Sequence, residues 1–403
     1  MKKIKLTAVL TAFTLMISGC TRIDNLTLPE EETEQTAEQT TEEIATEENE
    51  AEEITTEAIT EEPFIFPDTR AGEILASMTL EEKVGQMFLV RCPKENQGEI
   101  AAEHNIGGYV MFKTDFADAE NSSEMKAIVD GWQEQAKYGL IIATDEEGGD
   151  VTPVSSNDQY RLLPFSSQRY LYETGGLSLI DADAHEKAVL LSKVGVNLNL
   201  APVCDLSDNP GDYIYYRSAA GDAETAQEII ATIVERFQKD SVGCTLKHFP
   251  GYGANPDTHT GISVDSRDKE QFRSADFLPF EAGIEAGAEA VMMSHNIVTC
   301  MDNALPVSLS PAAHELLREE LGFTGVIITD DLAMEALAQY ADDKGALAVM
   351  AVKAGNDLLC TDTCEEEIPA VIEAVKKGEI SENQINTSVL RILEMKLKLG
   401  IIE

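Results

Sequence analysis

The chain reads Leu-Lys-His-Phe-Pro-Gly-Tyr-Gly-Ala-Asn-Pro-Asp-Thr-His over residues 246–259. A mostly apolar run ends at the first of these residues and predicts a short buried strand, which the glycines and prolines then end in a loop. The loop begins with Lys247 and His248 and carries Asp257 and His259 further on. An aspartate two residues before a histidine can orient the imidazole and fix its tautomer, as a general acid/base requires. The stretch therefore predicts a strand followed by a loop that performs chemistry.

Eight apolar runs of strand length alternate with amphipathic helical stretches from about residue 66 onward. They are 87–91, 108–112, 140–144, 196–202, 242–246, 290–294, 325–329 and 357–360. This alternation favours a closed parallel barrel, and no glycine-rich phosphate loop of a doubly wound sheet follows the first run. We expect an α/β protein with a single (β/α)8 TIM-type barrel over residues 66–403. A helix over 71–87 would open it, and helices near 366–376 and 382–398 would end it.

Polar residues directly follow five of these runs. They are Asp145 to Glu147, Asp205, Lys247 with His248, His295, and Asp330 with Asp331. In a (β/α)8 barrel the carboxyl ends of the strands meet at one face, and the active site lies there. Solvation of loops would explain one or two such positions, but five favour a functional site at that face.

The first twenty residues have the pattern of an export signal. Three early lysines precede a mostly apolar stretch, which closes with Ile-Ser-Gly-Cys at Cys20. This ending resembles a bacterial lipobox, which implies that Cys20 is lipidated; a plain secretory signal is the alternative. Residues 21–65 hold fifteen glutamates and predict a disordered acidic linker. We expect an exported protein that is lipid-anchored to the cell membrane on its extracytoplasmic face.

The composition and the cysteines exclude several kinds of partner. The formal net charge of −43 makes nucleic acid an unsuitable ligand. Four cysteines lie in or at the ends of apolar runs, which favours small buried side chains over a disulfide framework. They are Cys92, Cys204, Cys244 and Cys360. Cys360 and Cys364 have no second Cys or His pair nearby to complete a zinc site. We expect a monomer that uses no metal and no cofactor.

The stretch 247–259 resembles the signature of family 3 glycoside hydrolases, specifically their β-N-acetylglucosaminidase branch. Asp257-Thr258-His259 alone would also fit a polar surface turn, but here it follows Lys-His-Phe-Pro-Gly, as in that family. Further matches occur in order along the chain, among them Asp-Glu-Glu-Gly-Gly at 145–149 and the run 325–334. The resemblance covers nearly all of the chain from residue 78 to the C-terminal helices.

The resemblance implies three catalytic residues. Asp330 corresponds to the nucleophile, since a carboxylate can stabilise and then capture an oxocarbenium-like centre. His259, paired with Asp257, corresponds to the general acid/base. Asp331 is expected to point away from the site and to cap a helix that begins at Leu332.

The remaining matches imply residues that hold the substrate. They are Asp145, Arg217, Lys247, His248 and His295. For His295 a buried structural role is an equal alternative. The chain departs from the family pattern at Asp150 and Pro153, where arginines are usual, and at Tyr252, where a histidine is usual. The lost arginines remove partners for an anionic aglycone, which puts the substrate preference in doubt.

The sequence therefore predicts a retaining exo-β-N-acetylglucosaminidase that acts on terminal β-linked N-acetylglucosamine of cell-wall or related oligosaccharides. Three alternatives stay open. One is another β-glycosidase specificity within family 3, and a second is a phosphorylase, because an imidazole tolerates phosphate as acceptor. The third is a non-catalytic surface lipoprotein that binds sugars.

Overall fold

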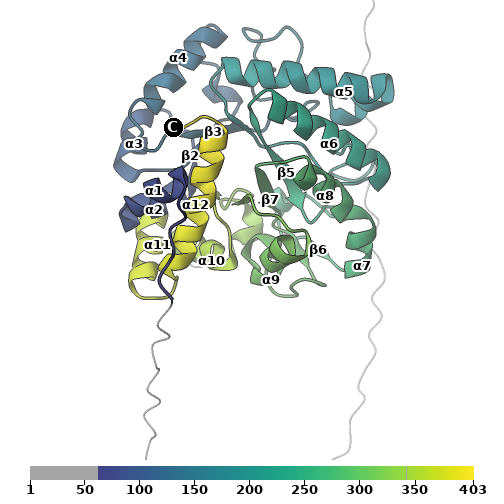
Figure 1. Ribbon diagram of the computed structural model, residues 1–403. Helices are drawn as coiled ribbons and strands as arrows, with labels where there is room; N and C mark the ends of the chain where they lie inside the picture. Colours follow the sequence, from purple (N-terminus) through teal and green to yellow (C-terminus); the bar gives the residue numbers. More distant parts are fainter. Residues whose placement is uncertain (1–61, 342) are drawn as a thin grey trace, which may run out of the picture. The chain divides into compact units, whose positions relative to one another are not determined.

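Eight parallel strands form the centre of the structure, one at each predicted apolar run (Figure 1). In sheet order they are β10 (Leu359–Thr361), β1 (Phe88–Arg91), β2 (Gly108–Val110), β3 (Ile141–Thr144), β4 (Leu198–Asn199), β5 (Gly243–Phe249), β7 (Ala290–Met293) and β9 (Val326–Thr329). A parallel bridge between Ile328 and Leu358 joins β9 to β10. The sheet thus closes on itself, and the predicted (β/α)8 barrel is confirmed.

The computed structural model describes residues 62–341 and 343–403. Cys20, the predicted export signal and nearly all of the predicted linker lie outside the described residues. In the part that the structure describes, no helix combines the length and the apolarity that crossing a bilayer requires.

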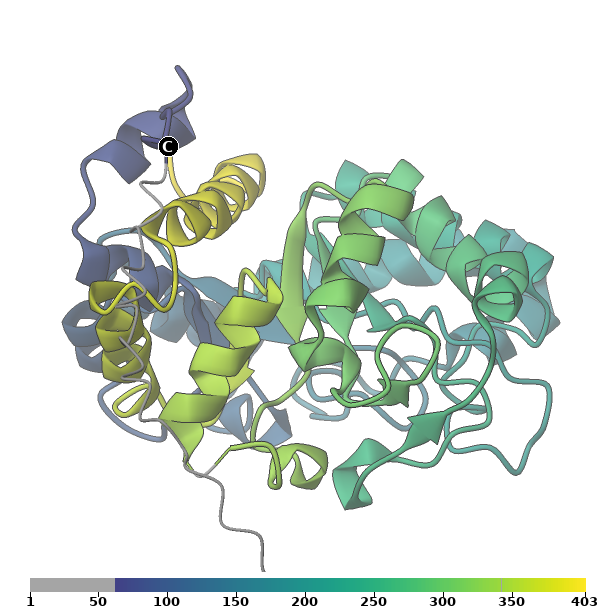
Figure 2. The same cartoon turned by 90° about the horizontal axis from the view of Figure 1, so that it is seen from below.

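Helices surround the strands, as Figures 1 and 2 show. They are α1 (Arg70–Ala76), α2 (Leu80–Gln86), α3 (Gln97–His104), α4 (Ser122–Gln133), α5 (Gln168–Lys193), α6 (Ala223–Lys239), α7 (Lys269–Gln271), α8 (Phe277–Glu285), α9 (Pro311–Glu315), α10 (Lys344–Ala354), α11 (Glu367–Lys376) and α12 (Glu382–Lys398). The helix predicted over 71–87 is two helices, because Thr79 and Glu82 form a capping box that starts α2 anew. The two predicted C-terminal helices are present as α11 and α12.

The core consists of the strand residues and the inner faces of these helices. Each residue of β9 is buried, as are all the residues of β3, β5 and β7. Such continuous apolar runs are typical of parallel strands covered on both sides. The four cysteines of apolar runs are buried and free, as predicted.

Two details of the chain differ from the sequence-based expectation and shape the site. Strand β5 continues through Lys247 and His248 to Phe249, so this pair belongs to the strand and not to the loop after it. A second, two-stranded sheet of β6 (Val264–Asp265) and β8 (Ile297–Val298) forms in the loops beyond β5 and β7.

A buried carboxylate secures the closing strands. Asp357 is fully buried, and its Oδ2 accepts hydrogen bonds from the Ile327 amide at 2.8 Å and from Arg318 Nη2 at 2.5 Å. Its Oδ1 accepts from Ser388 Oγ at 2.8 Å and from Arg391 Nη1 at 3.0 Å. One side chain thereby links β9, the segment before it and helix α12 at the point where the barrel closes.

We predict that Asp357→Ala lowers the free energy of unfolding by about 3–5 kcal/mol, because it leaves largely buried cations without their partner. Asp130→Ala is the matched control, since Asp130 pairs with Lys126 on the surface and its loss costs about 1 kcal/mol or less. Chemical denaturation of both variants measures the difference. Equal losses in the two variants would contradict the role given to Asp357.

Candidate active site

A cavity of about 590 Å³ opens at the carboxyl ends of the barrel strands. Six of the eight predicted site residues within the described chain line it: Asp145, Arg217, Lys247, His248, His259 and Asp330. Asp257 is hydrogen-bonded to one of these, and His295 does not line the cavity. The barrel thus brings together residues that lie far apart in the sequence.

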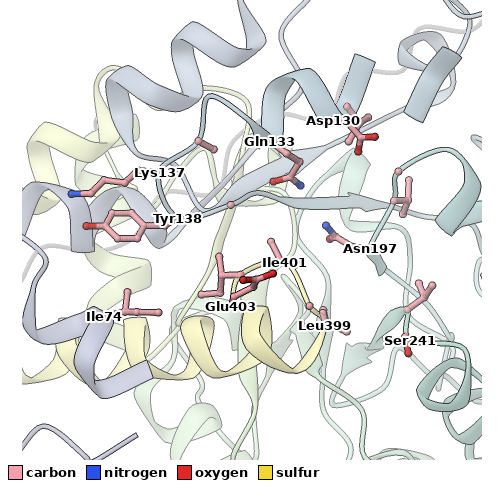
Figure 3. Close-up of a pocket in the computed structure, with 18 of the residues that line it drawn as sticks. Ile74, Asp130, Gln133, Lys137, Tyr138, Asn197, Ser241, Leu399, Ile401 and Glu403 are labelled. Carbon is pink, nitrogen blue, oxygen red and sulfur yellow. The ribbon is translucent and has the colours of Figure 1, made fainter. Parts of the chain in front are cut away.

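A larger cavity, of about 920 Å³, lies at the opposite end of the strands (Figure 3). Its walls include Gly139, Asn197 and Val242, which precede β3, β4 and β5, together with the C-terminal residues Ile401 and Glu403. None of the predicted site residues borders it. We therefore assign the chemistry to the smaller cavity, where the polar strand ends converge.

A compact cluster of four charges forms one wall of the active-site cavity. Lys247 Nζ lies 2.5 Å from Asp145 Oδ1 and 2.7 Å from Glu147 Oε1. Arg217 donates to the same Glu147 carboxylate twice, from Nε at 2.9 Å and from Nη2 at 2.7 Å. Burial opposes the charge on Glu147, but Lys247 and Arg217 outweigh it and hold the pKa of this carboxyl well below its usual range.

The loop after β3 needs glycine to present these carboxylates. Gly148 has φ +99°, and a Cβ atom there would lie 2.1 Å from the carbonyl oxygen of Ser166. Any side chain would push this turn away from the neighbouring segment. The Gly-Gly pair of the predicted motif therefore fixes the direction in which Glu147 and Asp145 point.

A second buried aspartate orients His248. Asp205 Oδ2 accepts from the backbone amide of His248 at 3.1 Å and lies 2.8 Å from its Nδ1. Its Oδ1 accepts from the Tyr252 amide at 2.7 Å. With Nδ1 donating to the carboxylate, His248 Nε2 accepts from Arg217 Nη2 at 3.3 Å. In this tautomer both ring nitrogens of His248 have protein partners.

Asp330 directly follows β9 and points into the cavity. Burial opposes its ionisation, but His295, His248 and the charge of Lys247 together outweigh that effect and hold the pKa of Asp330 below its ordinary value. The Asp331 amide also donates to its Oδ1 at 2.9 Å. Asp330 is therefore an anion near neutral pH.

The position of Asp331 differs from the prediction that it points away from the site and caps a helix. The strand ends before it, so it lines the same cavity and does not point away. Its Oδ1 accepts from the Ala333 amide at 2.9 Å, yet a turn follows, and no regular helix begins at Leu332. Burial raises the pKa of the Asp331 carboxyl, and the adjacent charge of Asp330 adds to this effect.

Asp257 and His259 form a pair at the start of a 3₁₀ helix, η2 (Thr258–Thr260). Asp257 Oδ1 lies 2.6 Å from His259 Nδ1 and accepts from the His259 amide at 2.9 Å. The His259 side chain is 60% exposed. Between them Thr258 is buried, and its hydroxyl is hydrogen-bonded to the hydroxyl of Tyr252. Tyr252, the departure noted in the sequence, thus ties the pair to the end of β5.

His295 is a buried support. Its Nδ1 lies 2.8 Å from Ser308 Oγ, and its Nε2 donates to the carbonyl of Asp331 at 2.9 Å. Burial lowers the pKa of this imidazole. Because both ring nitrogens already have protein partners, the geometry favours the structural alternative over a sugar contact.

The sequence reasoning missed three residues that build the site: Glu147, Asp205 and Tyr213. Glu147 stood inside a quoted motif and Asp205 among the strand-end residues, but neither received a role. Tyr213 lines the cavity and accepts a hydrogen bond from Arg217 Nη1 at 2.8 Å; no sequence pattern marked it. Within the described residues no group of three or more His, Cys, Asp or Glu side chains is arranged to hold a metal ion.

Comparison with known proteins agrees with this geometry. A family model described as the glycosyl hydrolase family 3 N terminal domain matches residues 79–395. A β-hexosaminidase of Stenotrophomonas maltophilia is 34% identical over 236 residues, which cover 57% of this chain and 69% of that protein. A β-hexosaminidase of Methylobacillus flagellatus is 30% identical over 270 residues, or 63% and 73% of the two chains.

A solved structure of the same family is also similar to this chain. The family 3 β-N-acetylglucosaminidase of Paenibacillus sp. str. FPU-7 superposes with a TM-score of 0.75 at 30% identity. The match covers 81% of this chain and 63% of that one, so this chain spans less than two thirds of the Paenibacillus protein.

We predict that Glu147→Gln lowers the free energy of unfolding at pH 7 by about 3–5 kcal/mol, because it leaves the positive charges of Lys247 and Arg217 without their shared anionic partner. The pKa of Glu147 is lower in the folded state, so its contribution is present above the unfolded-state pKa of about 4.3 and is lost as pH falls. The variant should therefore lose less stability than the wild type on acidification. Denaturation curves between pH 3 and pH 7 test this. Glu73→Gln, at an exposed ion pair, is the control; if both variants behave alike, the charge cluster does not stabilise the fold.

Proposed function

The chain belongs to glycoside hydrolase family 3, and we propose that it is a retaining exo-β-N-acetylglucosaminidase. It would remove terminal β-linked N-acetylglucosamine from cell-wall or related oligosaccharides. The single observation that carries the proposal is the cavity shared by Asp330 and His259, a half-buried carboxylate and an exposed imidazole that come from different loops. The β-hexosaminidases among its relatives support the sugar specificity.

In the first step the Asp330 carboxylate attacks the anomeric carbon while the bond to the leaving oxygen breaks. His259 donates its proton to that oxygen, so the aglycone leaves as a neutral alcohol. Asp257 stabilises the protonated imidazole before transfer through the 2.6 Å contact at Nδ1. The depressed pKa of Asp330 supports this assignment, because a nucleophile must be ionised when the substrate arrives.

In the second step a water molecule attacks the glycosyl-enzyme. His259 now accepts the proton of that water, and the bond between Asp330 and the anomeric carbon breaks. Two inversions at the same carbon retain its β configuration. The exposure of the His259 side chain supports this step, since water reaches the imidazole from the solvent side.

The remaining polar groups would hold the sugar. Asp145 is the exposed member of the charge cluster, with 25% of its side chain accessible, so it can accept from sugar hydroxyls. Lys247 is only 2% accessible and acts chiefly by fixing Asp145 and Glu147. His248 lines the same cavity, with its Nε2 bonded to Arg217 Nη2. These side chains are already held in place by each other, which reduces the entropy lost on binding.

Asp330→Asn should lower kcat on 4-nitrophenyl N-acetyl-β-glucosaminide by at least about 10³-fold, because the amide cannot form the glycosyl-enzyme. Asp130→Asn, on the surface pair, serves as the control and should retain full activity. The 4-nitrophenyl β-glucoside, assayed alongside, distinguishes the proposed specificity from a β-glucosidase. Hydrolysis at the wild-type rate by the Asp330 variant would refute the nucleophile, and no turnover by the wild type would favour a sugar-binding protein.

His259→Ala should slow hydrolysis of a disaccharide substrate by about 10²–10⁴-fold, because its leaving oxygen needs a proton. A 2,4-dinitrophenyl glycoside needs none, so its first step should proceed and a glycosyl-enzyme should accumulate, visible as a burst and by mass spectrometry. The control is His185→Ala, since His185 forms a similar contact with Asp240, at 2.8 Å, outside the cavity. Equal losses on both substrates would exclude His259 as the acid.

A further inference from the structure

Almost every cation in the described part of this acidic protein has a protein partner. Among the described lysines and arginines, only four have a side chain with neither a hydrogen bond nor an ion pair to another protein group. They are Arg91, Lys113, Lys193 and Lys353. Two of the four, Arg91 and Lys113, line the active-site cavity. The chain has 73 acidic and 30 basic residues, so acidic partners for a basic side chain are abundant. Two unpaired cations in the cavity therefore indicate that an anionic ligand binds there.

Arg91 and Lys113 come from neighbouring parts of the barrel. Arg91 ends β1, opposite Val110 of the adjacent strand β2, and Lys113 begins a short 3₁₀ helix, η1 (Lys113–Asp115), just beyond β2. The guanidinium of Arg91 lies over the ring of Phe112, 4.5 Å from its centroid. Stacking of this kind fixes the plane of the guanidinium and leaves its N–H donors available.

The other two cations of the cavity are not available. Lys247 and Arg217 are bound to Asp145 and Glu147, which neutralise them. Burial raises the pKa of Asp331, and the charge of Arg91 only partly opposes this rise, since the two side chains do not form an ion pair. The positive charge that the cavity can offer to a ligand is therefore that of Arg91 and Lys113.

We propose that Arg91 and Lys113 form an oxyanion site for a carboxylate or phosphate group of the ligand. The inference rests on the proposed function in one respect: terminal N-acetylglucosamine is neutral, so the anion belongs either to the aglycone or to free phosphate that replaces water as acceptor. The sequence suggested that an anionic aglycone had lost its partners at Asp150 and Pro153. The structure supplies two other cations, from β1 and from the segment after β2.

The first arm of the test compares two substrates that differ by one charge, 4-carboxyphenyl and 4-carbamoylphenyl N-acetyl-β-glucosaminide. Arg91→Gln and Lys113→Gln should each lower kcat/KM for the anionic substrate relative to the neutral one by about tenfold, the loss expected for a charge-assisted hydrogen bond. Lys193→Gln, at an unpaired lysine outside this cavity, makes the same change of charge and should leave the ratio unaltered.

The second arm adds inorganic phosphate to the neutral substrate. If phosphate is the ligand, one of its oxygens bonds to the anomeric carbon as the Asp330 ester breaks, and N-acetylglucosamine 1-phosphate forms without any proton transfer. That product should appear with the wild type and fall about tenfold in Arg91→Gln. Its absence, together with a changed substrate ratio in the first arm, assigns the site to the aglycone.

The proposal fails if neither arm separates Arg91→Gln from Lys193→Gln. It also fails if Arg91→Gln slows the neutral and anionic substrates equally and leaves the formation of the sugar phosphate unchanged. Calorimetric titration of the carboxyphenyl glycoside into Asp330→Asn, with and without Arg91→Gln, measures the anion site without turnover. Binding that weakens with Arg91→Gln would support the site even if the wild type hydrolysed no N-acetylglucosaminide. Unchanged or undetectable binding, together with no phosphate-dependent product in the second arm, would overturn it.

Discussion

The active site depends on one buried carboxylate held between a buried lysine and a largely buried arginine. Glu147 comes from the loop after β3, Lys247 from β5 and Arg217 from the segment between β4 and α6, and their contacts measure 2.7–2.9 Å. Removing charges from water costs several kcal/mol for each ion, and only close geometry recovers it. The cluster therefore exists only when strand β5 and two loops adopt one arrangement, and that arrangement fixes Asp145 at the cavity surface.

Neighbouring polar groups also set the ionisation of the proposed nucleophile, Asp330. The pKa of Asp330 is lowered by His295 and His248, by the hydrogen bond from the Asp331 amide and by the charge of Lys247. Asp205 in turn sets the tautomer of His248. His295 acts from behind the cavity while its ring nitrogens hold Ser308 and Asp331. His295, which does not line the cavity, thus helps to control the ionisation of the nucleophile.

The barrel could be predicted from the sequence because its signals are local: eight apolar runs, helical stretches between them and polar residues at the strand ends. Most of the cavity residues followed from the same pattern and from the family motifs. What could not be predicted depends on contacts between distant segments. The hydrogen bond from Arg217 to Tyr213, the burial of His295 and the position of Asp331 each depend on where a strand ends or how a loop packs. No spacing along the chain encodes these facts.

The acidity of the cavity explains why an imidazole suits the second catalytic role. Asp330 and Asp331 already place two carboxyls side by side, and burial and mutual repulsion raise the pKa of the second. A third carboxylic acid opposite them would have to remain protonated through a still larger shift. A histidine needs no such shift, because its cationic form is attracted by the same carboxylates that would repel another anion. His259 can therefore sit in an exposed loop, close to water, while the half-buried Asp330 keeps its charge.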